Sequence, residues 1–264
     1  MQNNNYELHI LGSRGTHSAF GDEFKEFGGQ TSCYVIKSND YALIIDCGTG
    51  LFNAKEILSG VKKIDVLLTH VHYDHIVGLI DERAILSNIE CTFYGTFSKW
   101  SNSNVFADFL RKPFWPVNTI VGNTININND GSVYKLNDEV SFKAYKAPHP
   151  DDASMFIINV NDKKVCILSD FGDANSVETN IINGGDFLFF DGTLNKEDAI
   201  KYKEWGHSCW NQGVELAKKE NIKNLIITHH NPAYNDEILR KMEDDCKNEF
   251  ANSRFARCGD KYKL

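Results

Sequence analysis

The stretch Thr69-His70-Val71-His72-Tyr73-Asp74-His75 places four metal-competent side chains within six residues. The apolar run Ile64–Leu68 precedes it and predicts a buried β-strand that ends at this cluster. A neutral imidazole is the commonest metal ligand, and a carboxylate can bind metal beside it. The first two histidines can point to the same side of an extended turn. The aspartate and the third histidine begin a predicted helix, displaced toward a second ion.

Composition narrows the class of protein around this cluster. The chain has 264 residues and a formal charge of −8, which disfavours a large nucleic acid as partner, because such partners normally require a basic face. The first five residues, Met1-Gln-Asn-Asn-Asn, carry no basic and then apolar secretion signal, and no window approaches the ~18 apolar residues of a membrane span. The seven cysteines include no Cys-x-x-Cys pair. We therefore expect a cytoplasmic protein with reduced thiols and no membrane association.

Apolar runs and turn residues predict strands and helices in both halves of the chain. The predicted strands are Tyr6–Leu11, Thr31–Lys37, Tyr41–Asp46, Ile64–Thr69, Ile89–Tyr94, Thr119–Ile127, Val133–Leu136, Val140–Ala147, Met155–Val160, Val165–Leu168, Phe187–Phe190 and Asn224–Thr228. The predicted helices are Gly50–Leu58, His75–Leu79, Ser98–Leu110, Ala174–Ile182, Ser208–Glu220 and Asp236–Asn248. No break in composition marks a boundary, so we expect one α/β domain over residues 1–264, with helices outside two stacked sheets.

Further polar side chains follow the later predicted strands. They are His149, Asp170, Asp191 and His229. Each alone is more often a turn or capping residue, but their recurrence with the first cluster favours a shared site for two ions. Adjacent residues at a strand end face opposite ways, so we expect His229 to enter the site and His230 to pack behind it.

Glycine-rich loops flank the early strands. Asp46-Cys-Gly-Thr-Gly50 follows a predicted strand, as a phosphate-binding loop does, but it lacks the P-loop lysine and the full dinucleotide fingerprint. We expect Asp46 to support the metal loop by hydrogen bonding. Thr31 and Ser32 fit either phosphate contacts or ordinary strand positions.

The spacing His70-x-His72-x-Asp74-His75, with later histidines and an aspartate after strands, resembles the metallo-β-lactamase fold hydrolases. That resemblance covers nearly the whole chain and implies a four-layer αββα sandwich with two mixed sheets and outer helices. It also implies a centre of two divalent ions, zinc in most members and manganese or iron in some. The implied ligands are His70, His72 and His149 for one ion, Asp74, His75 and His229 for the other, and Asp170 as a bridge.

Two later elements, Asp191-Gly-Thr193 and Gly206-His-Ser-Cys-Trp210, resemble the ribonuclease Z-related phosphodiesterase branch. The early elements Gly12-Ser-Arg-Gly15, Gly28-Gly-Gln-Thr-Ser-Cys33 and Asp46-Cys-Gly-Thr-Gly50 resemble its compact cyclic-nucleotide phosphodiesterase-like members. Three flanking positions depart from the usual Asn, Ala and Thr of that branch. They are Gln30, Cys47 and Cys209. These departures leave the metal ligands intact and bear on substrate preference.

The resemblance implies a phosphodiesterase that hydrolyses a small nucleotide, foremost a cyclic mononucleotide. A hydroxide shared by the two ions would attack phosphorus, with Asp74 orienting it or accepting its proton. His207, charged and held by Asp191, would protonate the leaving oxygen as general acid. A homodimer is also implied by resemblance.

Three alternatives stay open at this point. A ribonuclease Z-like RNA endonuclease would need a basic track, and no long Gly/Pro- and Lys-rich arm is present. A lactone or thioester hydrolase on the same scaffold would have less need of the Asp191/His207 pair. A non-catalytic metal-binding or partner-binding module would leave the complete ligand set unused.

Overall fold

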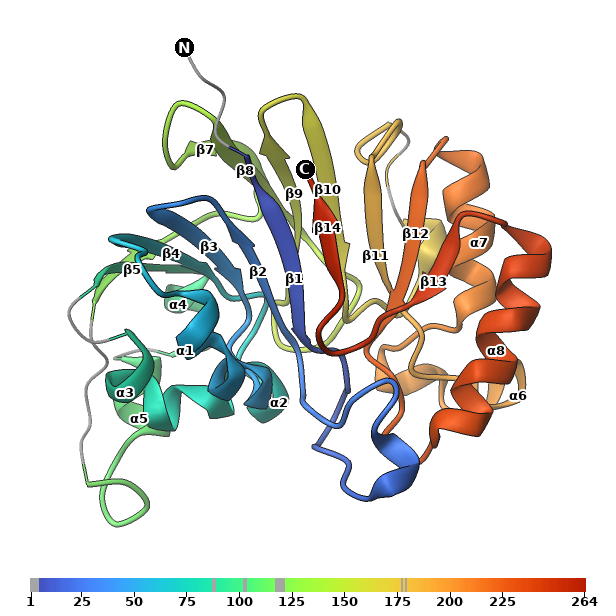
Figure 1. Cartoon of the computed structure of the whole chain (residues 1–264), viewed down its shortest axis with the longest axis horizontal. Coiled ribbons are helices and arrows are strands. Elements are labelled where there is room, and N and C mark those ends of the chain that lie inside the picture. Colours follow the sequence, from blue (N-terminus) through green and yellow to red (C-terminus); the bar gives the residue numbers. More distant parts are fainter. Residues whose placement is uncertain (1–4, 87–88, 102–103, 117–121, 177, 179) are drawn as a thin grey trace.

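The computed structural model describes residues 5–86, 89–101, 104–116, 122–176, 178 and 180–264. Two seven-stranded sheets stack face to face, with helices on their outer sides (Figure 1). The first sheet has the order β14 (Lys261–Lys263), β1 (Glu7–Gly12), β2 (Cys33–Lys37), β3 (Tyr41–Ile45), β4 (Lys63–Leu67), β5 (Glu90–Gly95), β6 (Asn123–Asn126). The second has the order β13 (Ser253–Phe255), β12 (Asn224–Thr228), β11 (Phe187–Asp191), β10 (Lys163–Leu168), β9 (Ser154–Val160), β8 (Val140–Lys146), β7 (Asp130–Lys135).

Both sheets are mixed in the same way. In the first sheet β14, β1, β2 and β3 pair antiparallel, whereas β3, β4, β5 and β6 pair parallel. In the second sheet β7, β8, β9 and β10 pair antiparallel, whereas β10, β11, β12 and β13 pair parallel. Loops that follow parallel strands meet at one edge of a sheet, which is where an α/β scaffold presents functional side chains.

Apolar side chains form three layers that hold the sandwich together. The layer between the sheets includes the fully buried Leu43, Phe142 and Phe189. Alternate residues of the same strands face outward, as the two-residue period of a strand requires, so Ile44 and Phe190 pack under the outer helices. Burying a side chain of this size stabilises the fold by roughly 1.5–3 kcal/mol.

Helices cover the two outer faces. On the first sheet they are α1 (Ala54–Ile57), α2 (Tyr73–Ile76), α3 (Glu82–Leu86), α4 (Phe97–Trp100) and α5 (Val105–Phe109). On the second they are α6 (Lys196–Lys201), α7 (Trp210–Lys219) and α8 (Asp236–Glu249). Short 3₁₀ turns η1 to η5 span Asp22–Phe24, Thr49–Asn53, Val77–Asp81, Ala174–Ser176 and Lys203–Trp205. The predicted αββα arrangement is therefore confirmed.

Several predicted helices differ in extent. The prediction Ser98–Leu110 is wrong as one helix, because Ser101 is extended and separates α4 from α5, with residues 102–103 outside the described ones. The prediction Ala174–Ile182 is also wrong in length, since only η4 forms there and residues 177 and 179 lie outside the described ones. In the predicted strand Thr119–Ile127, residues 119–121 lie outside the description, and β6 covers only Asn123–Asn126 of the remainder.

Over the part of the chain that the structure describes, every helix is too short or too polar to cross a membrane.

Candidate metal centre

The loop after β4 delivers the first cluster to the edge between the two sheets. His70 and His72 lie in the loop itself, and Asp74 and His75 occupy the first turn of α2. Asp46, directly after β3, lies beneath this loop and accepts hydrogen bonds from the backbone N–H and the hydroxyl of Thr69, each at 2.8 Å to its nearest carboxylate oxygen. The predicted supporting role of Asp46 is confirmed.

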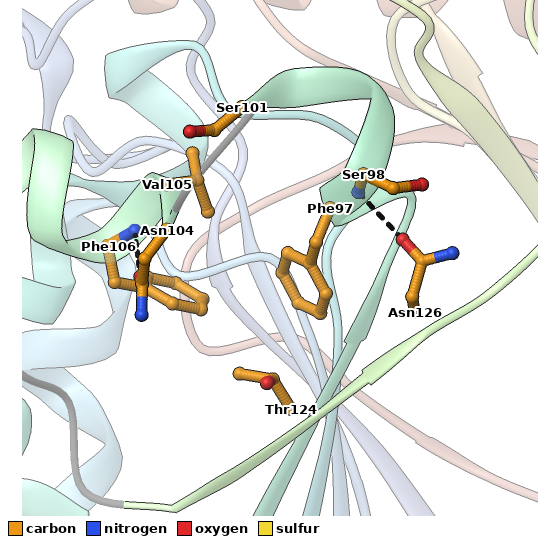
Figure 2. Close-up of a pocket in the computed structure, with 8 residues that line it drawn as sticks. All are labelled: Phe97, Ser98, Ser101, Asn104, Val105, Phe106, Thr124 and Asn126. Carbon is orange, nitrogen blue, oxygen red and sulfur yellow. Dashed lines mark hydrogen bonds between the residues drawn. The ribbon is translucent and has the colours of Figure 1, made fainter.

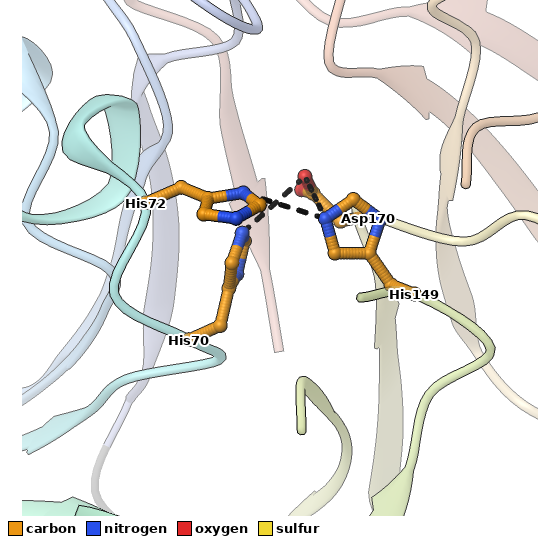
Figure 3. A group of neighbouring side chains, drawn as sticks. All are labelled: His70, His72, His149 and Asp170. Carbon is orange, nitrogen blue, oxygen red and sulfur yellow. Dashed lines mark hydrogen bonds and ion pairs between the residues drawn. The ribbon is translucent and has the colours of Figure 1, made fainter. Parts of the chain in front are cut away.

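The second sheet supplies the remaining predicted ligands. His149 follows β8, Asp170 follows β10 and His229 follows β12. Figure 3 shows His70 and His72 approaching from one side and His149 and Asp170 from the other, with their polar atoms turned toward one another. All seven predicted ligands thus lie together, although they come from both sheets.

Their polar atoms fall into sets that could each hold a metal ion. One comprises His70, His72 and His149 with Asp170, another comprises Asp74, His75 and His229, and a third combines Asp170 and His229 with His207. We call the first the His72 end and the second the His75 end of the cage.

Asp170 faces both ends with different oxygens. Its Oδ2 lies 3.7 Å from Nε2 of both His70 and His149. Its Oδ1 lies 3.1 Å from Nε2 of His75 and 3.3 Å from Nε2 of His229. Two ligand atoms that share a tetrahedral ion, each at ~2.0–2.2 Å from it, are separated by roughly 3.3–3.6 Å. These spacings suit a carboxylate between two ions.

Each imidazole has one nitrogen committed outside the cage. His75 Nδ1 donates to Asp46 Oδ2 at 2.7 Å, and His149 Nδ1 donates to the carbonyl oxygen of Gly206 at 2.8 Å. His72 is reversed, because its Nε2 donates to Asp151 Oδ2 at 3.0 Å and its Nδ1 lies 3.5 Å from His149 Nε2. Such outer partners fix the tautomer of metal-binding histidines.

The other two imidazoles are oriented through threonine hydroxyls. His70 Nδ1 lies 3.0 Å from the Thr69 hydroxyl, whose own proton is directed to Asp46. His229 Nδ1 lies 2.8 Å from the Thr193 hydroxyl, which donates to the carbonyl oxygen of His229. The Nε2 atoms of both rings face Asp170 and are free of these outer contacts.

The resulting cage fits cations. His75 Nε2 and His229 Nε2 approach to 3.4 Å and lie 3.1 and 3.3 Å from Asp170 Oδ1, so two ring nitrogens and a carboxylate oxygen converge at this end. Among the described residues, the buried atoms His70 Nε2 and Asp170 Oδ1 have no hydrogen-bond partner. Buried polar atoms normally have partners, so these two are available as metal ligands.

The pKa shifts of the side chains at the His75 end also favour cation binding. Burial lowers the pKa of His75, but the charges of Asp170, Asp74 and Asp46 outweigh it and raise that pKa well above the usual range. Burial raises the pKa of Asp170, yet the surrounding imidazoles lower it well below the usual range. This end therefore concentrates negative charge that attracts cations. At the His72 end burial dominates and lowers the pKa of His70 and of His149, which keeps both neutral for metal binding.

Backbone packing locks the His75 end. The N–H of Thr16 donates to Asp74 Oδ2 at 2.7 Å, and that oxygen lies 3.2 Å from His229 Nε2. A Cβ on Gly15 would lie 2.3 Å from the His229 ring, so only glycine allows this close approach. His230 packs behind, as predicted, with its ring stacked on Phe255 at 5.5 Å between centroids.

His207 and Asp191 form a pair beside the cage. His207 Nδ1 donates to Asp191 Oδ2 at 2.7 Å, and the His207 ring lies 5.1 Å from that of His149 and 5.0 Å from that of His229, between centroids. Burial lowers the pKa of His207, but Asp191 outweighs it and raises that pKa to about 9. The imidazole is therefore protonated at neutral pH and able to donate from Nε2.

Two of the glycine-rich loops are joined by hydrogen bonds between Thr31 and Thr49. Thr49 N–H donates to the Thr31 hydroxyl at 2.8 Å, and the backbone N–H of Thr31 donates to the Thr49 hydroxyl at 2.8 Å. A Cβ on Gly48 would lie 2.2 Å from the carbonyl oxygen of Asp74. Thr31, a candidate phosphate contact from the sequence, is buried in this turn, and its hydroxyl accepts the N–H of Thr49.

The cage opens into a cavity of about 360 Å³ lined by Thr16, Val71, His72, Tyr73, Asp74, Asp170, His207 and His229. A cavity of about 300 Å³ elsewhere lies between α4, α5 and β6, and its lining residues, shown in Figure 2, include none of the predicted ligands. The chemistry therefore belongs to the cavity above the cage.

Sequence reasoning missed two orienting side chains. Asp151 lies only two positions after His149, in a polar turn where its φ of 61° is positive, and the sequence gives no sign that it turns toward His72. Thr193 stood in a recognised motif, but its contact with His229 depends on the pairing of β11 with β12.

Comparison with known proteins agrees with this geometry. Residues 41–230 match the beta-lactamase superfamily domain, so the chain belongs to that superfamily. It resembles the ribonuclease Z of Bacillus velezensis, with 33% identity over 108 residues, 38% of this chain and 35% of that protein. It also resembles the anti-Pycsar protein Apyc1 of a Paenibacillus species, with 31% identity over 139 residues, 52% of this chain and 49% of that protein. The chain spans only about a third to a half of the length of these curated relatives.

Among solved structures, the metallo-beta-lactamase fold protein YhfI from Bacillus subtilis superposes with a TM-score of 0.75 and 18% identity, over 99% of this chain and 100% of that one. At that identity the likeness establishes the fold alone.

Proposed function

We propose that this chain is a phosphodiesterase that uses two divalent ions, foremost zinc, to hydrolyse a small nucleotide, foremost a cyclic mononucleotide. The observation that carries the proposal is the contact of the Asp191–His207 pair with both ends of the cage. A phosphodiester has a poor alkoxide leaving group, so its hydrolysis benefits from an acid placed beside the phosphorus. A thioester releases a thiolate, which is a better leaving group and has less use for that acid, so a thioester substrate is disfavoured.

The residues would divide the work as follows. His70, His72 and His149 would hold one ion, Asp74, His75 and His229 the other, and Asp170 would touch both. When bound, the pair of ions would offset the charge of the phosphate oxygens and make a water acidic enough to serve as nucleophile near neutral pH.

The chain's own groups would then move the protons. Asp74, which accepts the N–H of Thr16, would orient the attacking water and accept its proton. His207 would donate its Nε2 proton to the leaving oxygen while Asp191 stabilises the cation on the ring. Such general acid catalysis contributes ~10²–10⁴-fold.

The small substrate is favoured by the walls of the cavity. Its lining residues include no lysine or arginine, although a long RNA backbone needs a run of cations along its path. The formal charge of −8 also disfavours a long RNA, because it repels the phosphate backbone. The likeness to ribonuclease Z proteins keeps an RNA endonuclease as the second candidate.

One experiment separates these functions. Protein with its zinc, manganese and iron content measured is incubated with cyclic mononucleotides, cyclic dinucleotides and precursor transfer RNA in parallel. We expect turnover of the cyclic mononucleotides and none of the RNA. Cleavage of the precursor RNA with no nucleotide hydrolysis would replace the proposal by the endonuclease, and inactivity of the metal-loaded protein on every diester would reject both.

A further inference from the structure

A larger cavity of about 670 Å³ lies on the other side of His207. Its lining residues are Gly172, Asp173, Asn175, Lys196, Ala199, Ile200, His207, Cys209 and Gln212. His207 is shared with the cavity above the cage, so this side chain separates two adjoining spaces. The volume falls within the ~300–1,000 Å³ of small-molecule sites.

The position of His207 decides what can occupy the second space. A proton donor must lie within hydrogen-bond reach of the leaving oxygen, and phosphorus must lie over the cage. The group attached through the leaving oxygen then extends past His207, away from the cage. In a nucleotide diester that group is a nucleoside.

The walls suit a nucleoside, which has an apolar ring face and polar edges. Ala199 and Ile200 of α6 offer apolar surface, and Ile200 is 84% exposed. Gln212 accepts the backbone N–H of Cys209 with its Oε1 at 3.1 Å, which leaves its amide NH₂ for another partner. The ammonium of Lys196 lies 5.7 Å from the centroid of the Trp210 ring, and within the described ranges it forms no ion pair with a carboxylate.

We propose that the cavity bounded by His207 and α6 is the subsite for the nucleoside that carries the leaving oxygen, with Lys196 and Gln212 as its polar contacts. This inference rests on the proposed phosphodiesterase function and names residues that determine its substrate preference. A chain with this subsite prefers substrates with a nucleoside on the leaving side over diesters that have only a small alkyl group there.

The test compares a ligand that fills both spaces with one that fills only the first. The substitution Ala199→Phe adds volume to the wall of the subsite and leaves the cage untouched. Inorganic phosphate serves as the probe of the cage, and a nucleoside 5′-monophosphate, the product of 3′,5′-cyclic nucleotide hydrolysis, probes both spaces. Inhibition constants for the two probes and the KM for the cyclic nucleotide are measured on metal-quantified protein.

We expect Ala199→Phe to raise the nucleotide constants by about tenfold, the effect of ~1.4 kcal/mol of steric overpacking, with the phosphate constant and metal content unchanged. Lys196→Ala should move the nucleotide constants in the same direction by a smaller factor. Glu197→Ala, an exposed neighbour on α6 outside the cavity, is the matched control and should change neither.

The outcomes are distinguishable from failure of the proposed function. Nucleotide constants that do not move in Ala199→Phe, or that move together with the phosphate constant, overturn the subsite while wild-type nucleotide hydrolysis stands. Wild-type protein that binds phosphate but hydrolyses no nucleotide overturns the proposed function itself.

Discussion

At each end of the cage a carboxylate accepts a hydrogen bond from a predicted histidine ligand, but the two pairs differ greatly in solvent exposure. At the His75 end, Asp46 fixes the imidazole of His75, and both side chains are fully buried. At the His72 end, Asp151 fixes the imidazole of His72, but these side chains are 68% and 41% exposed. Water screens the exposed pair and offers substitute partners, whereas nothing replaces a buried partner. We infer that the His75 end is rigid and binds its ion more tightly, and that the His72 end exchanges its ion more readily.

The largest effect on activity is expected from substitution of His207, whose ring contacts histidines of both ends of the cage. His207→Ala should lower kcat by ~10²–10⁴-fold and leave the metal content unchanged, because it removes the proton donor and no expected ligand. Steady-state kinetics with parallel metal analysis measures both. A variant that loses an ion along with turnover would show that His207 belongs to the cage, and one that loses neither would refute the general acid.

The ion pair between Glu243 and Arg257 serves as a control, because breaking it should change the free energy of unfolding without touching a predicted metal ligand. Arg257 donates to both carboxylate oxygens of Glu243 at 2.9 Å. Burial raises the pKa of Glu243, but these bonds and the Phe255 N–H outweigh it and lower that pKa from 4.5 to about 2. Since the folded pKa is the lower one, the stabilisation is present above about pH 4.5 and is lost as pH falls toward 2.

The difference in unfolding free energy between wild type and Glu243→Gln should therefore be about 3 kcal/mol at pH 7 and close as pH falls from 4.5 to 2. Denaturant unfolding at a series of pH values measures it. A gap that stays constant with pH would mean that the carboxylate charge contributes nothing. Metal content at neutral pH should not change.

Asp46→Asn probes the buried end. The amide cannot accept as strongly from Thr69 and His75, and Asn tolerates the φ of 59° at this position. Affinity for the ion at the His75 end should fall ~10–100-fold, the effect usual for an outer partner of a metal-binding histidine. Competition with a chromophoric chelator measures the affinity. An unchanged value would remove the basis for calling this end rigid.

Asp151→Asn is the matched change at the exposed end, where φ is 61°. The exposed partner is replaceable by water, so affinity for the ion at the His72 end should fall by about tenfold or less. The same chelator titration applies. A loss larger than that of Asp46→Asn would reverse the comparison between the two ends.

The sequence predicted the fold class and named side chains that the structure brings together, for reasons visible in particular residues. Four of the seven predicted ligands are neighbours in the chain, so their number alone was informative. His149, Asp170 and His229 were informative only as a recurring pattern after strands. Short elements were missed: β13 and β14 have few residues and depend on neighbouring strands for their hydrogen bonds, and α6 has only six residues. The contact of Asp151 with His72 was not predicted, because the two residues lie 79 positions apart in the chain.

Native mass spectrometry of zinc-loaded protein during a chelator titration tests the central claim, that converging imidazoles and carboxylates bind two cations. We predict a chain mass with two ions, then one, then none, with the first ion removed more easily in Asp151→Asn. A chain that never carries more than one ion, at zinc concentrations that saturate the first, would contradict the account.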